Sequence, residues 1–185
     1  LLEAHGQVGP AEVPVKALWM IKNNLRKAAR LAVPLNPPAF HPFNPLLALR
    51  VSSLPLGEPV RQALVDALFQ AVWVRGLHVA EPEVVVDVAN ELGLDGVGLV
   101  TLAGQAEAKA RLRQQTDDAI AAGVFGVPTV AVGDEMFFGY DDFPYLEAYL
   151  AGDDPLAAST WPQWMGGPPR ASAMRRRFRD PRSAD

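Results

Sequence analysis

Two short stretches near the end of the chain carry residues that could recognise a peptide-like ligand. Val127 and Pro128 open the apolar run VPTVAV, and Phe138-Gly139-Tyr140-Asp141 follows the next run. Proline has no backbone N–H, so in a sheet it stands at a strand's first residue, an edge or a bulge. A peptide-like ligand could lie against such a strand start, although a simple kink at strand entry gives the same pattern. An aspartate at the following turn can hold an ammonium group or cap a helix.

Lys16 and Asn44 are further candidates. Lys16 begins a predicted helix, where a cation is unfavourable against the helix dipole, and this local conflict indicates a function. A solvated surface lysine is the competing interpretation. Asn44 precedes Pro45 in a pattern typical of an N-cap followed by the first helical residue, so capping competes with any binding role.

Composition excludes several kinds of chemistry. The 185 residues contain no cysteine, and hence no thiolate metal site or cysteine nucleophile. The three histidines lack metal-ligand spacing, so no metal is expected. A net charge of −4 does not favour nucleic acid, and Arg175-Arg176-Arg177 indicates only a solvated tail. No apolar run is long enough to span a membrane, which favours a cytoplasmic protein.

The elements that position these residues are mostly helices. Helical spacing predicts helices over about 15–32, from Leu46 onward, over 59–76, 82–93 and 106–123. Two short strands then meet at Gly133-Asp134, and Asp141 or Asp142 can cap a last helix over 143–152. Trp19, Phe69 and Trp73 are interpreted as core residues. Two strands alone are marginal, so we expect more strands from residues before Leu1 or from a partner.

The segment GVFGVPTVAVGDEMFFGYDDFPYLEAYL resembles the closing hairpin and helix of the thioredoxin-like fold. It is most similar to the glutathione-dependent 2-hydroxychromene-2-carboxylate isomerases and the kappa-class glutathione transferases. GQVGPAEVPVKALWMIKNNLRKAARLAVPL resembles that family's glycine-proline loop, lysine and first helix, and HPFNPLLALR its Pro-x-Asn segment. LFQAVWVRGLHVAEPEVVVDVANELGLD is similar to its helical insertion. The resemblance covers about Gly6 to Leu150 in one register.

This resemblance implies an α/β fold, a thioredoxin-like sheet with a large helical insertion. Residues 1–14 and 123–150 would form the thioredoxin-like subdomain, 15–122 the insertion, and 151–185 a C-terminal tail. The family's first strand-helix-strand unit takes roughly 30 or more residues and carries the serine that addresses the glutathione thiol. Only Leu1-Leu2 resembles the end of that unit. The catalytic serine is therefore unassigned here, because either the natural chain continues before Leu1 or this is a fragment without its chemistry.

The resemblance also implies roles for individual residues. The Val127–Pro128 bond would be cis and turn the backbone of Val127 toward the cysteinyl part of glutathione. Asp141 would hold the γ-glutamyl ammonium, although the family usually has Asp-Arg where this chain has Asp141-Asp142. Lys16 and Asn44 would face the substrate. The implied glutathione contacts are Gln7, Val127, Pro128, Phe138, Gly139, Tyr140 and Asp141.

The function implied is isomerisation of an aromatic ketoacid with glutathione as cofactor. The thiol would add to the ring-opened form of 2-hydroxychromene-2-carboxylate, a bond would rotate, and elimination would give the trans product. The expected partners are glutathione and a small aromatic carboxylate, with neither nucleic acid nor membrane, in a homodimer. Alternatives are a kappa-like transferase or peroxidase, a Dsb-type disulfide oxidoreductase with its cysteine pair before residue 1, and a non-catalytic helical scaffold.

Overall fold

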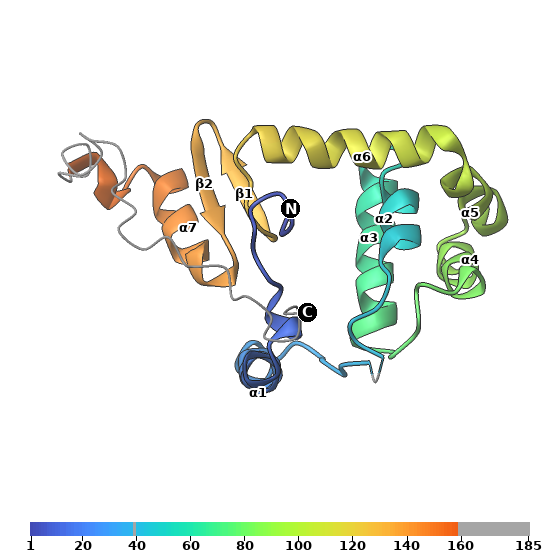
Figure 1. Ribbon diagram of the computed structural model, residues 1–185, viewed down its shortest axis with the longest axis horizontal. Coiled ribbons are helices and arrows are strands. Elements are labelled where there is room, and N and C mark those ends of the chain that lie inside the picture. Colours follow the sequence, from blue (N-terminus) through green and yellow to red (C-terminus); the bar gives the residue numbers. More distant parts are fainter. Residues whose placement is uncertain (39, 159–185) are drawn as a thin grey trace, which may run out of the picture. The chain divides into compact units, whose positions relative to one another are not determined.

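The computed structural model describes residues 1–38 and 40–158 and divides into two compact units, Leu1–Val127 and Pro128–Asp185. The first unit holds η1 (Pro10–Glu12), α1 (Pro14–Leu31), α2 (Leu46–Ser52), α3 (Glu58–Trp73), α4 (Pro82–Glu91), α5 (Gly96–Gly104) and α6 (Ala106–Ala121) (Figure 1). The second holds β1 (Thr129–Val132), β2 (Glu135–Phe138), η2 (Tyr140–Asp142), α7 (Phe143–Ala151) and η3 (Pro155–Ala158). Within the described part of the chain, no helix combines the length and the apolar character needed to cross a bilayer.

The core of the first unit lies among α2, α3, α4 and α5. Aliphatic residues at helical spacing, such as Leu64, Leu68 and Val72 on α3, point inward. Leu64, Val51, Val79, Val85 and Val88 are the largest fully buried side chains. Proline stands in the first turn of both α3 and α4, where its missing N–H costs nothing. The predicted helices over 59–76 and 82–93 are therefore confirmed, with α3 ending somewhat earlier.

Helix α5 is an element that the sequence analysis did not predict. Its sequence, GVGLVTLAG, holds three glycines, which lower intrinsic helix propensity. Asp95 caps it by accepting a hydrogen bond from the Gly98 N–H at 2.9 Å. Gly96 is buried against α4, and a Cβ there would overlap the carbonyl oxygen of Val86. Tertiary packing thus overrides the weak local propensity.

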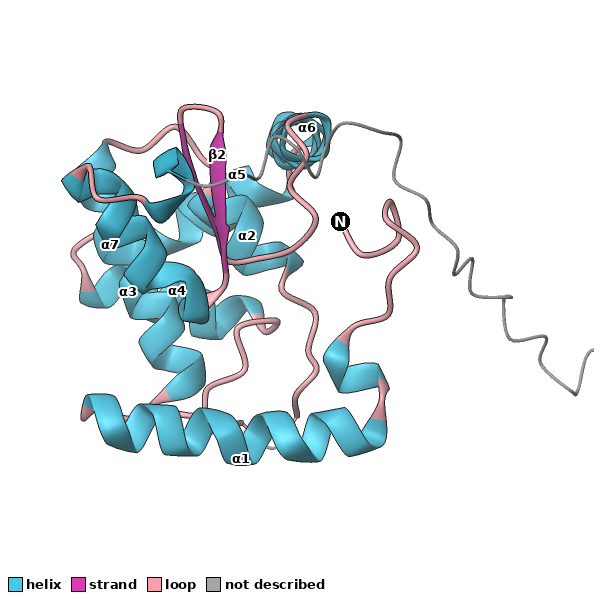
Figure 2. Cartoon of the chain, turned by 90° about the vertical axis from the view of Figure 1, so that its left-hand side faces the viewer, coloured by secondary structure: helices cyan, strands magenta, loops and turns pink. Residues whose placement is uncertain are grey.

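The second unit is built on a hairpin. Strands β1 and β2 pair antiparallel with Thr129 opposite Phe138 and Val132 opposite Glu135, and Gly133 adopts φ +61° in the turn. This confirms the predicted hairpin at Gly133-Asp134. Helix α7 lies beside the hairpin (Figure 2). The rings of Tyr149 and Phe137 join the two, with centroids 5.5 Å apart. Residue 39 and the part of the predicted tail after residue 158 lie outside the described residues.

Several residues lie in surroundings that differ from those predicted. Trp19 and Phe69 were interpreted as core, but each is 62% exposed, so this prediction was wrong. Phe69 follows Leu68 directly and is rotated by about 100° from the buried stripe of α3. Leu1-Leu2 lies in a turn rather than at a strand end. The helix predicted over 15–32 is confirmed as α1, although Leu18, Ile21 and Leu25 on it are exposed. The predicted subdomain grouping stays a prediction.

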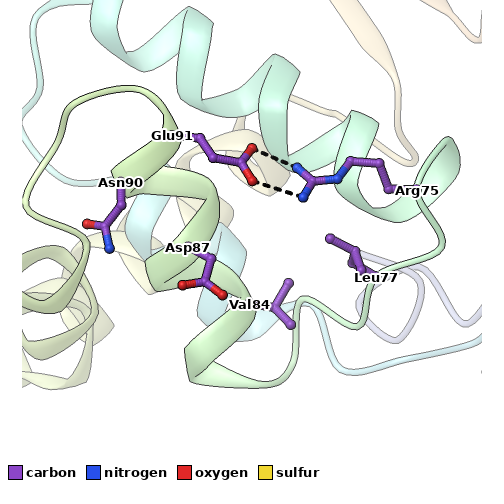
Figure 3. A pocket seen from close by; sticks show the side chains of 6 residues that line it. All are labelled: Arg75, Leu77, Val84, Asp87, Asn90 and Glu91. Carbon is purple, nitrogen blue, oxygen red and sulfur yellow. Dashed lines mark hydrogen bonds and ion pairs between the residues drawn. The ribbon is translucent and has the colours of Figure 1, made fainter.

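An ion pair joins the chain just after α3 to α4. Arg75 donates two hydrogen bonds to the Glu91 carboxylate, at 2.7 and 2.9 Å (Figure 3). These hydrogen bonds lower the pKa of Glu91, burial opposes the shift, and the charge of Arg75 adds to it. The pair is solvent-exposed, so its effect on stability is small.

We expect Leu64→Ala to destabilise the helical unit strongly. Leu64 is fully buried, and truncating such a leucine costs about 2–5 kcal/mol through lost burial and the cavity left behind. The measurement is denaturant unfolding followed by far-ultraviolet circular dichroism. Leu102→Ala is the matched control, because Leu102 is 46% exposed. An equal loss of unfolding free energy in the two variants would show that Leu64 does not belong to the core.

We also expect Arg75→Gln to raise the pKa of Glu91 toward its ordinary value. Because the folded pKa is lowered, the pair's stabilisation is present above the unfolded pKa of about 4.3 and is lost as pH falls through the folded value. Carboxyl carbon NMR shifts across a pH titration give the pKa directly. An unchanged Glu91 titration in the variant would contradict the bidentate contact.

Candidate functional site

The Val127–Pro128 bond is trans, so the predicted cis bond was wrong. Among the described residues, the only cis peptide bond joins His41 and Pro42. The trans form of an X-Pro bond is favoured by about 0.5–1 kcal/mol unless surrounding contacts reverse the preference. Val127 is 72% exposed, so no close packing of its side chain selects the cis form. A proline at a strand start does not by itself distinguish the two isomers.

The backbone at this strand entry is nevertheless partly open. Neither the N–H nor the C=O of Val127 makes a hydrogen bond to another residue that the structure describes. The carbonyl of Pro128, in contrast, accepts from the Gly139 N–H at 2.9 Å. Pro128 is thus tied to the end of β2, whereas Val127 retains one unpaired donor and one unpaired acceptor.

The turn after β2 is held by Asp142. Its Oδ2 atom accepts a hydrogen bond from the Phe138 N–H at 2.8 Å. Gly139 adopts φ +79°, a conformation that side chains disfavour, and so lets the chain reverse between Phe138 and Asp142. Asp142 also occupies the N-cap position of α7, but its side chain makes no cap hydrogen bond there. Asp142, one of the two aspartates that the sequence offered as caps, therefore has a structural role in this turn.

Asp141 and Tyr140 lie one and two residues before Asp142, in η2. Both side chains are exposed, and the rings of Tyr140 and Phe143 stack edge-to-face with centroids 5.6 Å apart. The Asp141 carboxylate is therefore exposed to solvent, next to the aspartate that accepts the hydrogen bond from Phe138.

The remaining predicted residues lie in the first unit. Lys16 is exposed in the first turn of α1, and its side-chain ammonium makes no hydrogen bond or ion pair with a residue that the structure describes. Helix α2 has Pro45 at its N-cap, so the predicted pair with Asn44 as N-cap and Pro45 as first helical residue was wrong by one position. Asn44 lies one residue earlier and accepts a hydrogen bond from the Leu46 N–H at 3.0 Å through Oδ1, while its amide N–H groups have no partner among the described residues. Gln7 is exposed, with its backbone N–H donating to Leu2. No hydrogen bond or ion pair joins these three side chains to one another.

An apolar pocket of about 320 Å³, which the sequence did not predict, lies between α2 and α3. We call it the α2–α3 pocket. Phe43, Leu49, Phe69 and Trp73 line it, together with buried residues of the core. The sequence signal was a run of aromatic residues, Phe40, His41 and Phe43, before α2. In the fold, Phe43 lies 6.5 Å from Trp73 and 6.5 Å from His78 between ring centroids.

Two other cavities have charged walls. One, of about 580 Å³, is lined by the Arg75–Glu91 pair with Asp87 and Asn90 (Figure 3). The other, of about 790 Å³, lies between α2 and α6 and carries Arg50, Lys109 and Arg113. The described residues hold no cluster of histidine and carboxylate side chains suited to a metal ion.

The relatives of this sequence include two kinds of enzyme, isomerases and a glutathione transferase. Residues 1–151 match the DSBA-like thioredoxin domain family. A 2-hydroxychromene-2-carboxylate isomerase of Pseudomonas putida is 32% identical over 150 residues, covering 80% of this chain and 72% of the relative. One of Sphingobium xenophagum is 29% identical over 149 residues, covering 80% and 75%. Glutathione s-transferase kappa 2 of Caenorhabditis elegans is 28% identical over 160 residues, covering 77% and 69%.

A solved structure agrees with these relatives. The chain superposes on a 2-hydroxychromene-2-carboxylate isomerase with a TM-score of 0.73 and 29% identity, covering 84% of this chain and 76% of the other. The helical unit and the hairpin with α7 are therefore parts of a DSBA-like thioredoxin fold. The predicted resemblance and fold class are confirmed, and the chain belongs to the DSBA-like thioredoxin domain family, together with the 2-hydroxychromene-2-carboxylate isomerases.

Proposed function

We propose that this chain is a glutathione-dependent isomerase of the 2-hydroxychromene-2-carboxylate type, acting on an aromatic ketoacid. The observation that carries the proposal is the 32% identity to the Pseudomonas putida isomerase over 80% of this chain. The relatives support an enzyme, and the glutathione-dependent step is our inference. Location in the cytoplasm and assembly as a homodimer stay predictions.

The residues of the chain fit the proposed cofactor in two respects. Val127 offers a backbone N–H and C=O that have no partner among the described residues, as a strand edge offers to an extended peptide, and the cysteinyl part of glutathione has that form. Asp141 offers an exposed carboxylate that could pair with the γ-glutamyl ammonium. Pro128, Phe138, Gly139, Tyr140 and Gln7 complete the proposed contacts. When bound, glutathione supplies the thiol that this cysteine-free sequence lacks.

Lys16 and Asn44 are proposed to hold the substrate. The Lys16 ammonium has no partner among the described residues and could pair with the ketoacid carboxylate. The Asn44 side chain is fixed through Oδ1 by Leu46, which leaves its N–H groups to donate to a substrate oxygen. Both residues would orient the substrate rather than take part in bond formation.

The second candidate function is a kappa-like glutathione transferase, which the relative from Caenorhabditis elegans favours. It would use the same glutathione site. The two functions differ in stoichiometry, because a transferase consumes glutathione in each turnover and an isomerase returns it.

We expect the intact natural protein to convert 2-hydroxychromene-2-carboxylate to its trans ketoacid isomer with glutathione at catalytic concentration. Ultraviolet absorbance follows the conversion, and thiol titration at its end should recover all the glutathione. Stoichiometric loss of the thiol would instead favour the transferase. Absence of both reactions, with no glutathione binding by calorimetry, would contradict the proposed function.

We expect Asp141→Asn to weaken glutathione binding by about ten- to a hundredfold, because a charge-assisted hydrogen bond contributes about 1.5–3 kcal/mol. The melting temperature should stay the same, since Asp142 holds the turn. Asp142→Asn is the matched control, because it removes the same charge one residue away and keeps an oxygen acceptor for the Phe138 N–H. Calorimetric titration and melting curves on both variants decide the matter. Equal loss of affinity in the two would mean that net charge at the turn, and not Asp141, matters.

A further inference from the structure

The α2–α3 pocket has the size and lining of a small-molecule site. Its volume of about 320 Å³ lies at the lower end of the ~300–1,000 Å³ typical of ligand pockets. Leu68, Val72 and Val79 on its wall are 5%, 4% and 2% exposed, so these side chains are fixed by the core. The pocket is therefore preformed and does not need a ligand to order it.

The lining selects for an uncharged group. Ser52 is the only polar side chain among the lining residues, and its hydroxyl already donates to the Ala48 carbonyl at 2.8 Å. A charged group placed here would lose hydration without finding a partner, which costs several kcal/mol or more. The two larger cavities carry charged walls and would not favour an apolar ring.

Aromatic side chains surround the pocket. Trp73 and Phe43 contact each other with an interplanar angle of 55°, and His41 lies 5.5 Å from Trp73 between ring centroids. Phe69 also lines the pocket and is 62% exposed, a large apolar surface left open to water. Flat aromatic ligands gain from offset or edge-to-face contacts with such rings. A ring seated beside Phe69 would cover this exposed surface.

A polar group stands next to the pocket in sequence. Asn44 lies between Phe43 and Pro45, both of which line the pocket, and its amide N–H groups have no partner among the described residues. A ligand that fits both features has an apolar ring at one end and an oxygen acceptor at the other. An aromatic carboxylate has this form.

We propose that the α2–α3 pocket binds the aromatic ring of the substrate, with Phe69 and Trp73 as specificity-determining residues. The proposal rests on the proposed function, since it places the ring of the same aromatic ketoacid. It adds a binding surface formed by α2 and α3 to the two polar residues already named.

The test uses 2-naphthoate as the probe and the intact natural protein. We expect Phe69→Ala to weaken 2-naphthoate binding by about tenfold in calorimetric titration, because the variant removes most of one apolar contact surface. It should raise KM for the ketoacid with little change in kcat. Tyr145→Ala is the matched control, since Tyr145 is an aromatic residue on α7 and is 61% exposed. Glutathione affinity should be unchanged in both.

A second variant, Ala48→Leu, adds bulk to the α2 wall of the pocket and leaves the residue at position 69 unchanged. It should also weaken 2-naphthoate binding, and circular dichroism confirms that each variant is folded. Unchanged binding in both variants would overturn the proposal. So would a change in sedimentation from dimer to monomer on Phe69→Ala, which would make this face an interface between copies. If 2-naphthoate binds as expected but no isomerisation occurs, the pocket stands and the proposed function fails.

Discussion

The burial of aliphatic side chains among α2, α3, α4 and α5 is the interaction on which the first unit depends. Its fully buried members come from four separate parts of the chain, among them Val51, Leu64 and Val85. Leu68 and Val72 belong both to this core and to the wall of the α2–α3 pocket. The shape of the pocket is therefore set by the packing that stabilises the unit. We therefore expect a mutation of Leu68 or Val72 to change the shape of the pocket directly, because these core side chains form its wall.

The helices and the hairpin could be predicted because their signals are local. Proline in the first turn, glycine at the end and a stripe of aliphatic residues lie within one window of sequence for α3 and α4. Helix α5 could not be predicted in this way, because its glycines lower helix propensity and Gly96 is favourable only where α4 packs against it. The exposure of Phe69 could not be predicted either. It depends on which other helices pack against that face of α3, and no local pattern of sequence reports this packing.

The candidate site was less predictable than the fold. The sequence placed an aspartate at the turn after β2 but could not separate Asp141 from Asp142, since both suit an N-cap. The hydrogen bond from the Phe138 N–H shows that Asp142 has a structural role, and it is visible only in the fold. The isomer of the Val127–Pro128 bond was also beyond local reasoning, because the two forms differ by only about 0.5–1 kcal/mol and surrounding contacts decide between them.

The first unit has three kinds of surface: a cavity with a paired cation and anion, polar groups whose donors lack a partner, and an apolar pocket. Arg75 and Glu91 satisfy each other, so their cavity has no unpaired cation from that pair for a ligand. Lys16 and the amide of Asn44 have no such partner for their donors among the described residues, whereas the α2–α3 pocket is almost free of polar side chains. A ligand that paired with these donors and filled the pocket would combine an anionic oxygen with a flat apolar body. An aromatic ketoacid does so, whereas a phosphorylated sugar or an acidic peptide would leave the pocket exposed to water. Under the proposed function, the unpaired donors would bind the anionic end of the ketoacid, and the α2–α3 pocket would bind its ring.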